Sequence, residues 1–369
     1  MTMPRKINQR LADRMIRRHI FTQRLSNEQA RKVLAMWQKF RPTLLGKLTE
    51  LLEGKKSMSN KALTTLLTQI DKTVKTELRD EFKVLAEGLA EFADTEAEYL
   101  TDTLTAALQP ALSVPAVEVV GVVTGAQIAA TAMKNPFQGN TLMQWPDSLS
   151  EWTRTQISNQ VRAGFIQGKP TMQIIADVKR ALGGRSAQAI SSVVKSAVNH
   201  YAATARELMV KANDDILDGR QWLSTLDTHT STLCQLRDRL FYPVDVTPET
   251  KGKRDGKVVA GSQYGAGPGK LHYCCRSTET WKVKGMEDWP SGKRPALKAE
   301  AGKLLSEQVS AKTDFFSWVQ RQPRHILEEL YGVQRADQIL RGVKVPTMFN
   351  DAGELMTIQQ PKNKGLWRD

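Results

Sequence analysis

Two groups of chemically active side chains lie in the second half of the chain, each beside an apolar segment. The first group is Asp227, His229, Ser231 and Cys234, and the second is His272, Cys274, Cys275 and Arg276. Thiol, imidazole and carboxylate groups can bind a transition metal, and the same groups can form a nucleophile with its base. If the fold brings the two groups together, this is the region where we expect chemistry.

A zinc site is one interpretation of these residues. Zinc takes about four nitrogen, sulfur or oxygen ligands in a tetrahedral array. The chain has no CxxC pair, so the ligands would have to come singly from separate places. The candidates for three ligands are Cys234, His272 and Cys275, and for the fourth Asp227, His229 or Cys274.

Two catalytic interpretations use the same residues. A nucleophile pair of Cys234 and His272 needs a lowered thiol pKa and a third group that orients the imidazole. Asp227, His229 and Ser231 have the residue types of a Ser-His-Asp triad, although one short turn holds all three.

In the structural interpretation these side chains hold loops in place. Asp227 and Thr230 cap a turn, His272 bonds to the backbone, and the cysteines pack as small apolar side chains. We favour this interpretation. From the sequence alone we assign no catalytic residue and no cofactor, and zinc remains the alternative.

Short strands are expected to position these residues. Alternating polar and apolar side chains predict strands at 220–226, 239–244 and 275–283. The segment 251–270 contains six glycines and five Lys or Arg residues, which predicts a mobile loop.

Helical periodicity dominates the first 215 residues. Ser26 is the expected N-cap of one helix, and Pro42 is expected to break or restart it. Residues 60–108 predict one or two long helices, and Gly183 with Gly184 is expected to end a later one. The predicted fold class is α+β, with a mostly helical N-terminal half, a small antiparallel-strand module and a helical C-terminal extension.

We expect four regions along the chain. They are a basic helical arm at 1–56, a helical domain at 57–145, an α+β module at 146–300 and a C-terminal extension at 301–369.

Composition excludes several classes of protein. The chain has 369 residues, of which 40% are apolar and 25% are charged, as in ordinary globular proteins. Wholesale disorder and a low-complexity fibre are therefore excluded. Three cysteines argue against a disulfide framework and indicate a reducing cytoplasm. The N-terminal run interleaves charged and apolar residues, so we expect no secretory signal there.

The apolar stretch 114–133 contains Pro115, Glu118 and Gln127. A buried glutamate in mid-span is costly in a bilayer, so we expect a buried helix or hairpin and no stable membrane span.

The net charge of +14 is unevenly distributed. Residues 1–56 carry +10, residues 57–145 carry −5, and the remainder carries +9. A cationic segment attracts a polyphosphate without reading its sequence, although it can also bind an acidic protein or simply stay solvated. The candidate phosphate contacts are Arg14, Arg17, Arg18, Lys251, Lys253 and Arg254.

The segment 222–234, WLSTLDTHTSTLC, resembles the signature of the phage Mu-type head morphogenesis family, the minor head proteins of tailed phages. The likeness continues in PGKLHYCCRS and covers residues from about 150 to 360. The turn 237–239 departs from the Asp-Gly turn of the family. The residues that match are Trp222, Ser224, Asp227, Thr230, Ser231, Cys234, Phe241, Pro268, His272, Cys275, Arg276 and Ser277.

The resemblance implies a non-enzymatic protein of the virion that acts in head morphogenesis. It implies several copies per particle in the head interior near the portal vertex, after assembly in the host cytoplasm. The implied partners are the portal protein, the major capsid protein and the packaged double-stranded DNA. Two alternatives remain, an internal protein ejected into the host with the genome and a Cys/His- or zinc-dependent hydrolase or nuclease.

Overall fold

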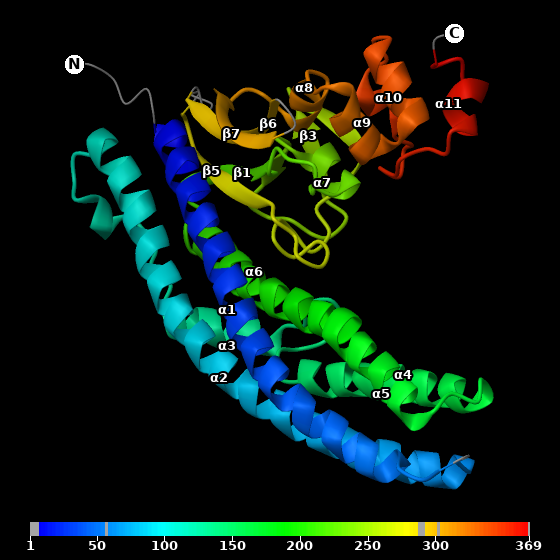
Figure 1. Ribbon diagram of the computed structural model, residues 1–369. Coiled ribbons are helices and arrows are strands. Elements are labelled where there is room, and N and C mark those ends of the chain that lie inside the picture. Colours follow the sequence, from blue (N-terminus) through cyan, green and yellow to red (C-terminus); the bar gives the residue numbers. More distant parts are fainter. Residues whose placement is uncertain (1–6, 56–57, 287–291, 301–302, 368–369) are drawn as a thin grey trace.

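The computed structural model describes residues 7–55, 58–286, 292–300 and 303–367 (Figure 1). The predicted fold class is confirmed. A helical N-terminal half is followed by a five-stranded antiparallel sheet, a separate hairpin and short C-terminal helices. Residues 1–6 and Lys56 of the predicted basic arm lie outside the described residues.

Two long helices form the outer layer of the helical half. They lie side by side and antiparallel, and both curve along their length (Figure 1). At 1.5 Å per residue they extend over about 69 and 74 Å. Shorter helices pack against them. The helical elements of this half are α1 (Ile7–Leu52), α2 (Asn60–Leu108), η1 (Gln109–Ala111), η2 (Ala116–Glu118), α3 (Gly125–Lys134), α4 (Trp145–Ile166), α5 (Thr171–Ala181), the π-helical η3 (Leu182–Ser186) and α6 (Ala187–Ala212).

The prediction that a helix begins at Ser26 and breaks at Pro42 is wrong, because α1 runs through both residues. Ser26 is buried, and its hydroxyl donates to the Gln23 carbonyl at 2.9 Å. Trp37 and Leu44, on either side of the proline, are fully or almost fully buried. Packing on both sides of Pro42 therefore outweighs its helix-breaking cost of about 3 kcal/mol.

Gly183 and Gly184 do not end the helical run as predicted. They lie in the π-helical turn η3, which joins α5 directly to α6. The carbonyl of Leu182 in this turn accepts a hydrogen bond of 3.2 Å from the indole of Trp37. A Cβ on Gly183 would lie 2.6 Å from a guanidinium nitrogen of Arg41, so the Arg41 side chain of α1 lies close above this turn.

The main sheet has the strand order β4-β3-β2-β1-β5, and all neighbouring strands are antiparallel. A separate hairpin and short helices complete the C-terminal half. The strands are β1 (Leu217–Leu223), β2 (Phe241–Pro243), β3 (Lys251–Arg254), β4 (Lys257–Gln263), β5 (Thr278–Val283), β6 (Lys293–Glu300) and β7 (Lys303–Ser310). The helices are α7 (Thr232–Arg237), α8 (Phe315–Val319), α9 (Arg324–Tyr331), α10 (Val333–Leu340), η4 (Val345–Met348) and α11 (Gln359–Asn363).

The prediction of a mobile loop at 251–270 is wrong for the first half of this segment, which forms the hairpin β3–β4. Asp255 and Gly256 form the turn, with φ of 49° and 77°. Two consecutive residues with positive φ are typical of the type I′ turn, which Asp-Gly favours. This dipeptide was the sequence signal for a hairpin.

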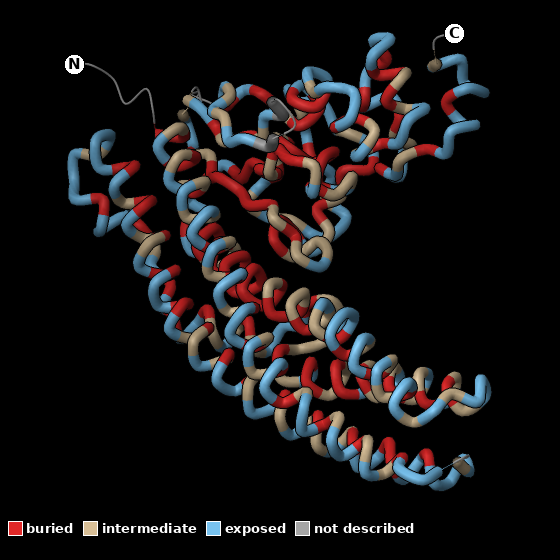
Figure 2. Tube along the Cα trace, in the orientation of Figure 1, coloured by how far each residue is buried: buried red, intermediate tan, exposed pale blue. Residues whose placement is uncertain are grey.

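One hydrophobic core extends through the helical half and reaches the sheet. It includes side chains from Ile7 to Val283, so the predicted boundaries after residues 56 and 145 fall within a single core. A second core lies under the hairpin and the C-terminal helices, and a third surrounds Trp222. Figure 2 shows the buried residues along the facing sides of the helices.

The apolar stretch 114–133 forms the short turn η2 and most of α3 instead of one buried helix or hairpin. No helix within the described ranges is both long and apolar enough to cross a membrane.

Gly164 gives a test of the packing between α4 and α5. A Cβ at this position would lie 2.4 Å from Cγ1 of the buried Ile174. We expect Gly164→Ala to lower the free energy of unfolding by about 1–3 kcal/mol. Gly46→Ala is the matched control, because nothing lies within 4 Å of its added Cβ. The control should raise stability by about 0.5–1 kcal/mol. Urea unfolding measures both, and a stabilised Gly164→Ala would contradict this packing.

Candidate functional site

An ion pair brings the two sequence-predicted groups together. The Arg276 guanidinium donates to both carboxylate oxygens of Asp227, at 2.5 and 2.7 Å. Asp227 is buried. Burial alone would raise the pKa of this carboxyl, but the hydrogen bond and charge of Arg276 outweigh it and lower the pKa. The pair therefore fixes the segment after β1 against the segment before β5.

The same carboxylate organises the turn that leads into α7. It accepts hydrogen bonds from the His229 backbone at 3.0 Å and the Thr230 hydroxyl at 3.1 Å. Ser231 then caps α7 by accepting from the backbone N–H of Cys234. The turn-capping role expected of Asp227 and Thr230 is confirmed, and the cap orients Cys234 toward the second segment.

Cys234, His272 and Cys275 form a compact group at this junction. The Cys234 sulfur lies 3.2 Å from Nε2 of His272 and 3.7 Å from the Cys275 sulfur. All three donor atoms lie within 4.8 Å of one another. Both cysteines are buried, at 2% and 0% exposure. Cys234 is far from His272 and Cys275 in the sequence, and the fold brings the three side chains together.

The contacts within this group shift the pKa values of its members in different directions. The hydrogen bond from Cys234, together with His272, lowers the Cys275 pKa well below its ordinary range. Conversely, bonding to Cys275 and burial raise the Cys234 pKa. Burial opposes protonation of His272, but its interactions with Cys275 outweigh burial and raise the His272 pKa.

Cys274 is excluded from the group by its backbone. Its φ of 53° is left-handed, which is uncommon for a residue other than glycine. Its sulfur lies 3.7 Å from the Ser192 carbonyl, and its N–H donates to the Ser196 hydroxyl at 3.0 Å. The turn thus directs Cys274 toward α6 and leaves His272 and Cys275 facing Cys234.

The arrangement differs from the candidate triad. Ser231 Oγ lies 2.8 Å from Nε2 of His272, and Asp227 is engaged by Arg276. Asp227, His229 and Ser231 therefore do not form a Ser-His-Asp relay, because the imidazole beside the serine comes from the other segment. Asp227 and Cys274 are likewise absent from the three-residue donor group.

A hydrogen-bond network connects Trp222 to this group. The Trp222 indole donates to Ser224 Oγ at 3.1 Å, and that hydroxyl donates to the Cys234 carbonyl at 2.7 Å. Trp222, Cys234 and Cys275 share the third core. The main motif residues of the family resemblance therefore meet in one place. They are Trp222, Asp227, Thr230, Ser231, Cys234, His272, Cys275 and Arg276.

Asp238 is a structural residue that sequence reasoning missed. It is fully buried and accepts from the Ser224 backbone at 2.8 Å, from Arg294 at 2.9 Å and from the Phe315 backbone at 2.8 Å. It joins the sheet, the hairpin and α8.

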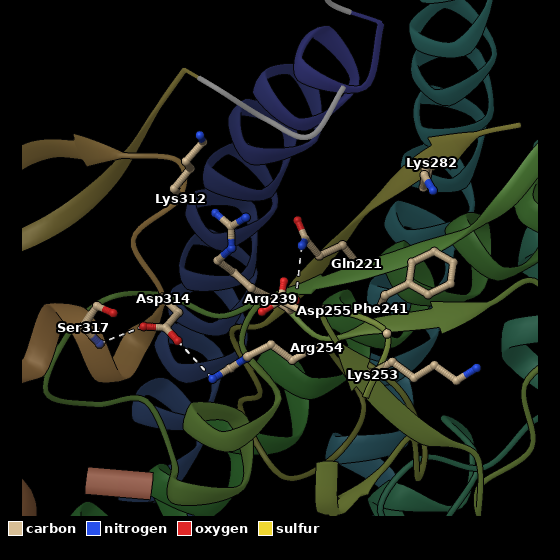
Figure 3. A pocket seen from close by; sticks show the side chains of 11 residues that line it. Gln221, Arg239, Phe241, Lys253, Arg254, Asp255, Lys282, Lys312, Asp314 and Ser317 are labelled. Atoms are coloured by element: carbon tan, nitrogen blue, oxygen red, sulfur yellow. Dashed lines mark hydrogen bonds and ion pairs between the residues drawn. The ribbon is translucent and has the colours of Figure 1, made fainter. Parts of the chain in front are cut away.

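A basic cavity of about 540 Å³ lies between the sheet and α8 (Figure 3). It contains two of the predicted phosphate contacts, Lys253 and Arg254, but Lys251 does not line it. Arg254 pairs with Asp314 at 3.1 Å. Lys253 and Lys312 are exposed and form no ion pair within the described part of the chain. The charged residues that line the cavity are Arg239, Lys253, Arg254, Asp255, Lys282, Lys312 and Asp314.

The predicted contacts on α1 divide into two kinds. Arg14 and Arg17 are exposed. Arg18 instead donates to the buried carboxylate of Glu96 at 2.6 Å, and its guanidinium lies 4.6 Å from the Tyr99 ring centroid. Arg18 holds α1 against α2 and so leaves the set of phosphate contacts.

Because α1 is continuous, Arg14 and Arg17 belong to a longer cationic stripe. At 3.6 residues per turn, its seven exposed cations occupy a sector of about 100° and a length of about 44 Å. Among the described residues, only Lys32 of this stripe forms an ion pair, with Glu28. The expected break at Ser26 concealed the pattern. The stripe consists of Arg10, Arg14, Arg17, Arg24, Arg31, Lys32 and Lys39.

Comparison of the chain with protein-family models, with curated proteins and with solved structures finds no match. The resemblance to the phage head proteins therefore rests on the sequence motifs and remains an expectation.

The ion pair of Asp227 gives a prediction with a defined pH dependence. We expect Asp227→Asn to lower the free energy of unfolding by about 2–3 kcal/mol at pH 7, because Arg276 loses a charged partner. The folded-state pKa of Asp227 is lowered, so its contribution is complete above the unfolded pKa of about 3.9. The difference between the wild type and the variant should shrink as the pH falls through the folded-state pKa.

Urea titrations at several pH values measure this difference. Asp80→Asn is the matched control, because its ion pair with Lys83 is exposed. A wild-type advantage that is small at pH 7, or that grows toward acidic pH, would contradict the role of this pair.

Proposed function

We propose that this protein is a minor head protein of a tailed phage, which acts in head morphogenesis and contacts packaged DNA without sequence preference. Its place is the head interior near the portal vertex, where it docks on the portal or the inner capsid. It is present in several copies per particle. The motif order over residues 150–360 supports the class of protein, and the meeting of its main residues in one network supports their relation to one another.

The cationic stripe on α1 is the observation that carries the DNA contact. Seven exposed Lys or Arg side chains follow the face of α1 that lies opposite its core side. Cations that neutralise phosphates release condensed counterions, and this gain does not depend on the base sequence. A long row of positive charge suits the regular polyanion of a duplex. Lys251, Lys253 and the basic cavity supply a second set of contacts.

The fold fixes this stripe relative to the sheet module. The Asn8 side chain accepts from the Val283 backbone at 3.0 Å and so satisfies the edge strand β5. Nε2 of His19 lies 2.7 Å from the Arg276 carbonyl. Burial lowers the pKa of His19 to about 4, so it is neutral at pH 7 and donates to that carbonyl. The proposed DNA surface and the family motif are thus parts of one framework.

A Cys/His-dependent hydrolase or nuclease is the second candidate, because Cys234 lies 3.2 Å from His272. The acidic thiol, however, is that of Cys275, whose side chain is fully buried. A nucleophile must reach its substrate, so burial favours a structural role. Turnover of nucleic acid or ester substrates that is abolished by Cys275→Ser would favour the enzyme.

Salt titration tests the proposed DNA contact. We expect the affinity for a DNA duplex to fall steeply with salt and to be equal for two unrelated sequences. In the triple variant Arg14→Gln, Arg24→Gln and Arg31→Gln, the slope of log affinity against log salt should become shallower by about 2.7, because each phosphate contact contributes about 0.9. Fluorescence anisotropy measures these slopes.

The matched control replaces three exposed lysines on α2 and α5, as Lys61→Gln, Lys72→Gln and Lys179→Gln. It removes the same charge and should leave the slope close to that of the wild type. A shallow wild-type slope, or an equal change in both triple variants, would contradict binding through the stripe.

A further inference from the structure

The positions of the three donor atoms at the junction fit a specific ligand geometry. Two zinc-bound sulfurs at about 2.3 Å from the metal lie about 3.8 Å apart in a tetrahedron, and a sulfur and a nitrogen lie about 3.6 Å apart. The Cys234 and Cys275 sulfurs are 3.7 Å apart, and Cys234 is 3.2 Å from Nε2 of His272. The donors are therefore already near the spacing that a metal ion requires.

His272 presents the correct nitrogen to this group. Its Nδ1 lies 2.9 Å from the Tyr273 carbonyl, which can only accept, so Nδ1 carries the hydrogen. In the neutral ring, Nε2 then directs its lone pair toward the two sulfurs. Metal-binding histidines usually hold their second nitrogen in this way. The observation is independent of the sulfur spacing and favours the same ligand.

Hydrogen bonds from neighbouring residues hold both cysteines in place. The Ser277 N–H bonds to the Cys275 sulfur, and the Ser224 hydroxyl bonds to the Cys234 carbonyl. The left-handed turn at Cys274 brings His272 and Cys275 onto one side. Strained backbone of this kind persists where the surroundings require it.

The fourth corner is defined by Ser231 and a small cavity. Ser231 Oγ lies 2.8 Å from Nε2 of His272. A cavity of about 10 Å³, bordered by Ser231, Cys234 and His272, has room for about one water molecule. The spacing Ser231-x-x-Cys234 matches the spacing His272-x-x-Cys275. Each segment therefore presents two of the four side chains that surround the metal position.

We propose that Cys234, His272 and Cys275 bind a zinc ion, with a water molecule held by Ser231 in the fourth position. Two thiolates and an imidazole form the soft donor set that zinc prefers. The ion joins the start of α7 to the segment before β5. This site does not depend on the proposed head function, because a zinc-joined module can serve any partner.

Metal analysis of the full-length protein tests the site. Protein prepared with zinc under reducing conditions should contain about one zinc per chain by elemental analysis. After removal of zinc, cobalt(II) should give the visible bands of tetrahedral coordination and a near-ultraviolet thiolate charge-transfer band. Zinc far below one per chain, together with a cobalt spectrum like that of the free ion, would overturn the proposal. A native disulfide between Cys234 and Cys275, detected by intact mass, would overturn it too.

Three variants separate ligands from neighbours. Cys275→Ser should weaken zinc binding by at least about a hundredfold, the upper end of the loss expected for an outer-shell partner. Cys274→Ser is the matched control, because its thiol faces α6, and it should retain full zinc content. Ser231→Cys completes a Cys3His set and should strengthen binding by about tenfold or more. This gain cannot result from misfolding. Equal loss of zinc in both cysteine variants, or no gain in Ser231→Cys, would contradict the assigned ligands.

Discussion

The ion pair between Asp227 and Arg276 is the interaction on which the sheet module depends. It connects two segments that are separated by a hairpin and a glycine-rich loop, and it leaves Cys234 facing His272 and Cys275. The carboxylate also accepts bonds from its own turn, so the pair sets both the turn and the junction. A two-point guanidinium–carboxylate contact fixes orientation as well as distance. Without it, the pairing of β1 with β5 and the apolar contacts of Trp222 would remain, but the two segments beyond the strand ends would lose their charged link.

A second constraint arises from the length of α1. This helix contributes to the main core along its whole course, and its start also bonds to β5 through Asn8. One face is therefore committed to α2 and α6, while the opposite face retains the basic residues. Arg18 marks the border between the two faces, since its charge is neutralised by Glu96 inside the helical layer. The division explains how a strongly basic segment can be both a core element and a charged surface.

The sequence predicted element types better than element limits. The strands around Trp222 and Trp281 and the long helix at 60–108 follow local periodicity, and the structure has them close to the expected places. The helix limits predicted from Ser26, Pro42 and the Gly183–Gly184 pair are wrong, because tertiary packing overrides local propensity. The site residues were recognisable by type, but the exclusion of Cys274 depends on one backbone angle, and the engagement of Asp227 depends on a partner 49 residues away. Neither leaves a local signal in the sequence.

Purified particles show most directly whether this chain is a component of phage heads. Quantitative mass spectrometry of purified mature particles and precursor heads, from a phage whose genome contains this coding sequence, measures its copy number relative to the portal and major capsid proteins. We expect several copies per particle. Its absence from both preparations, with the portal and capsid proteins readily detected, would contradict the account.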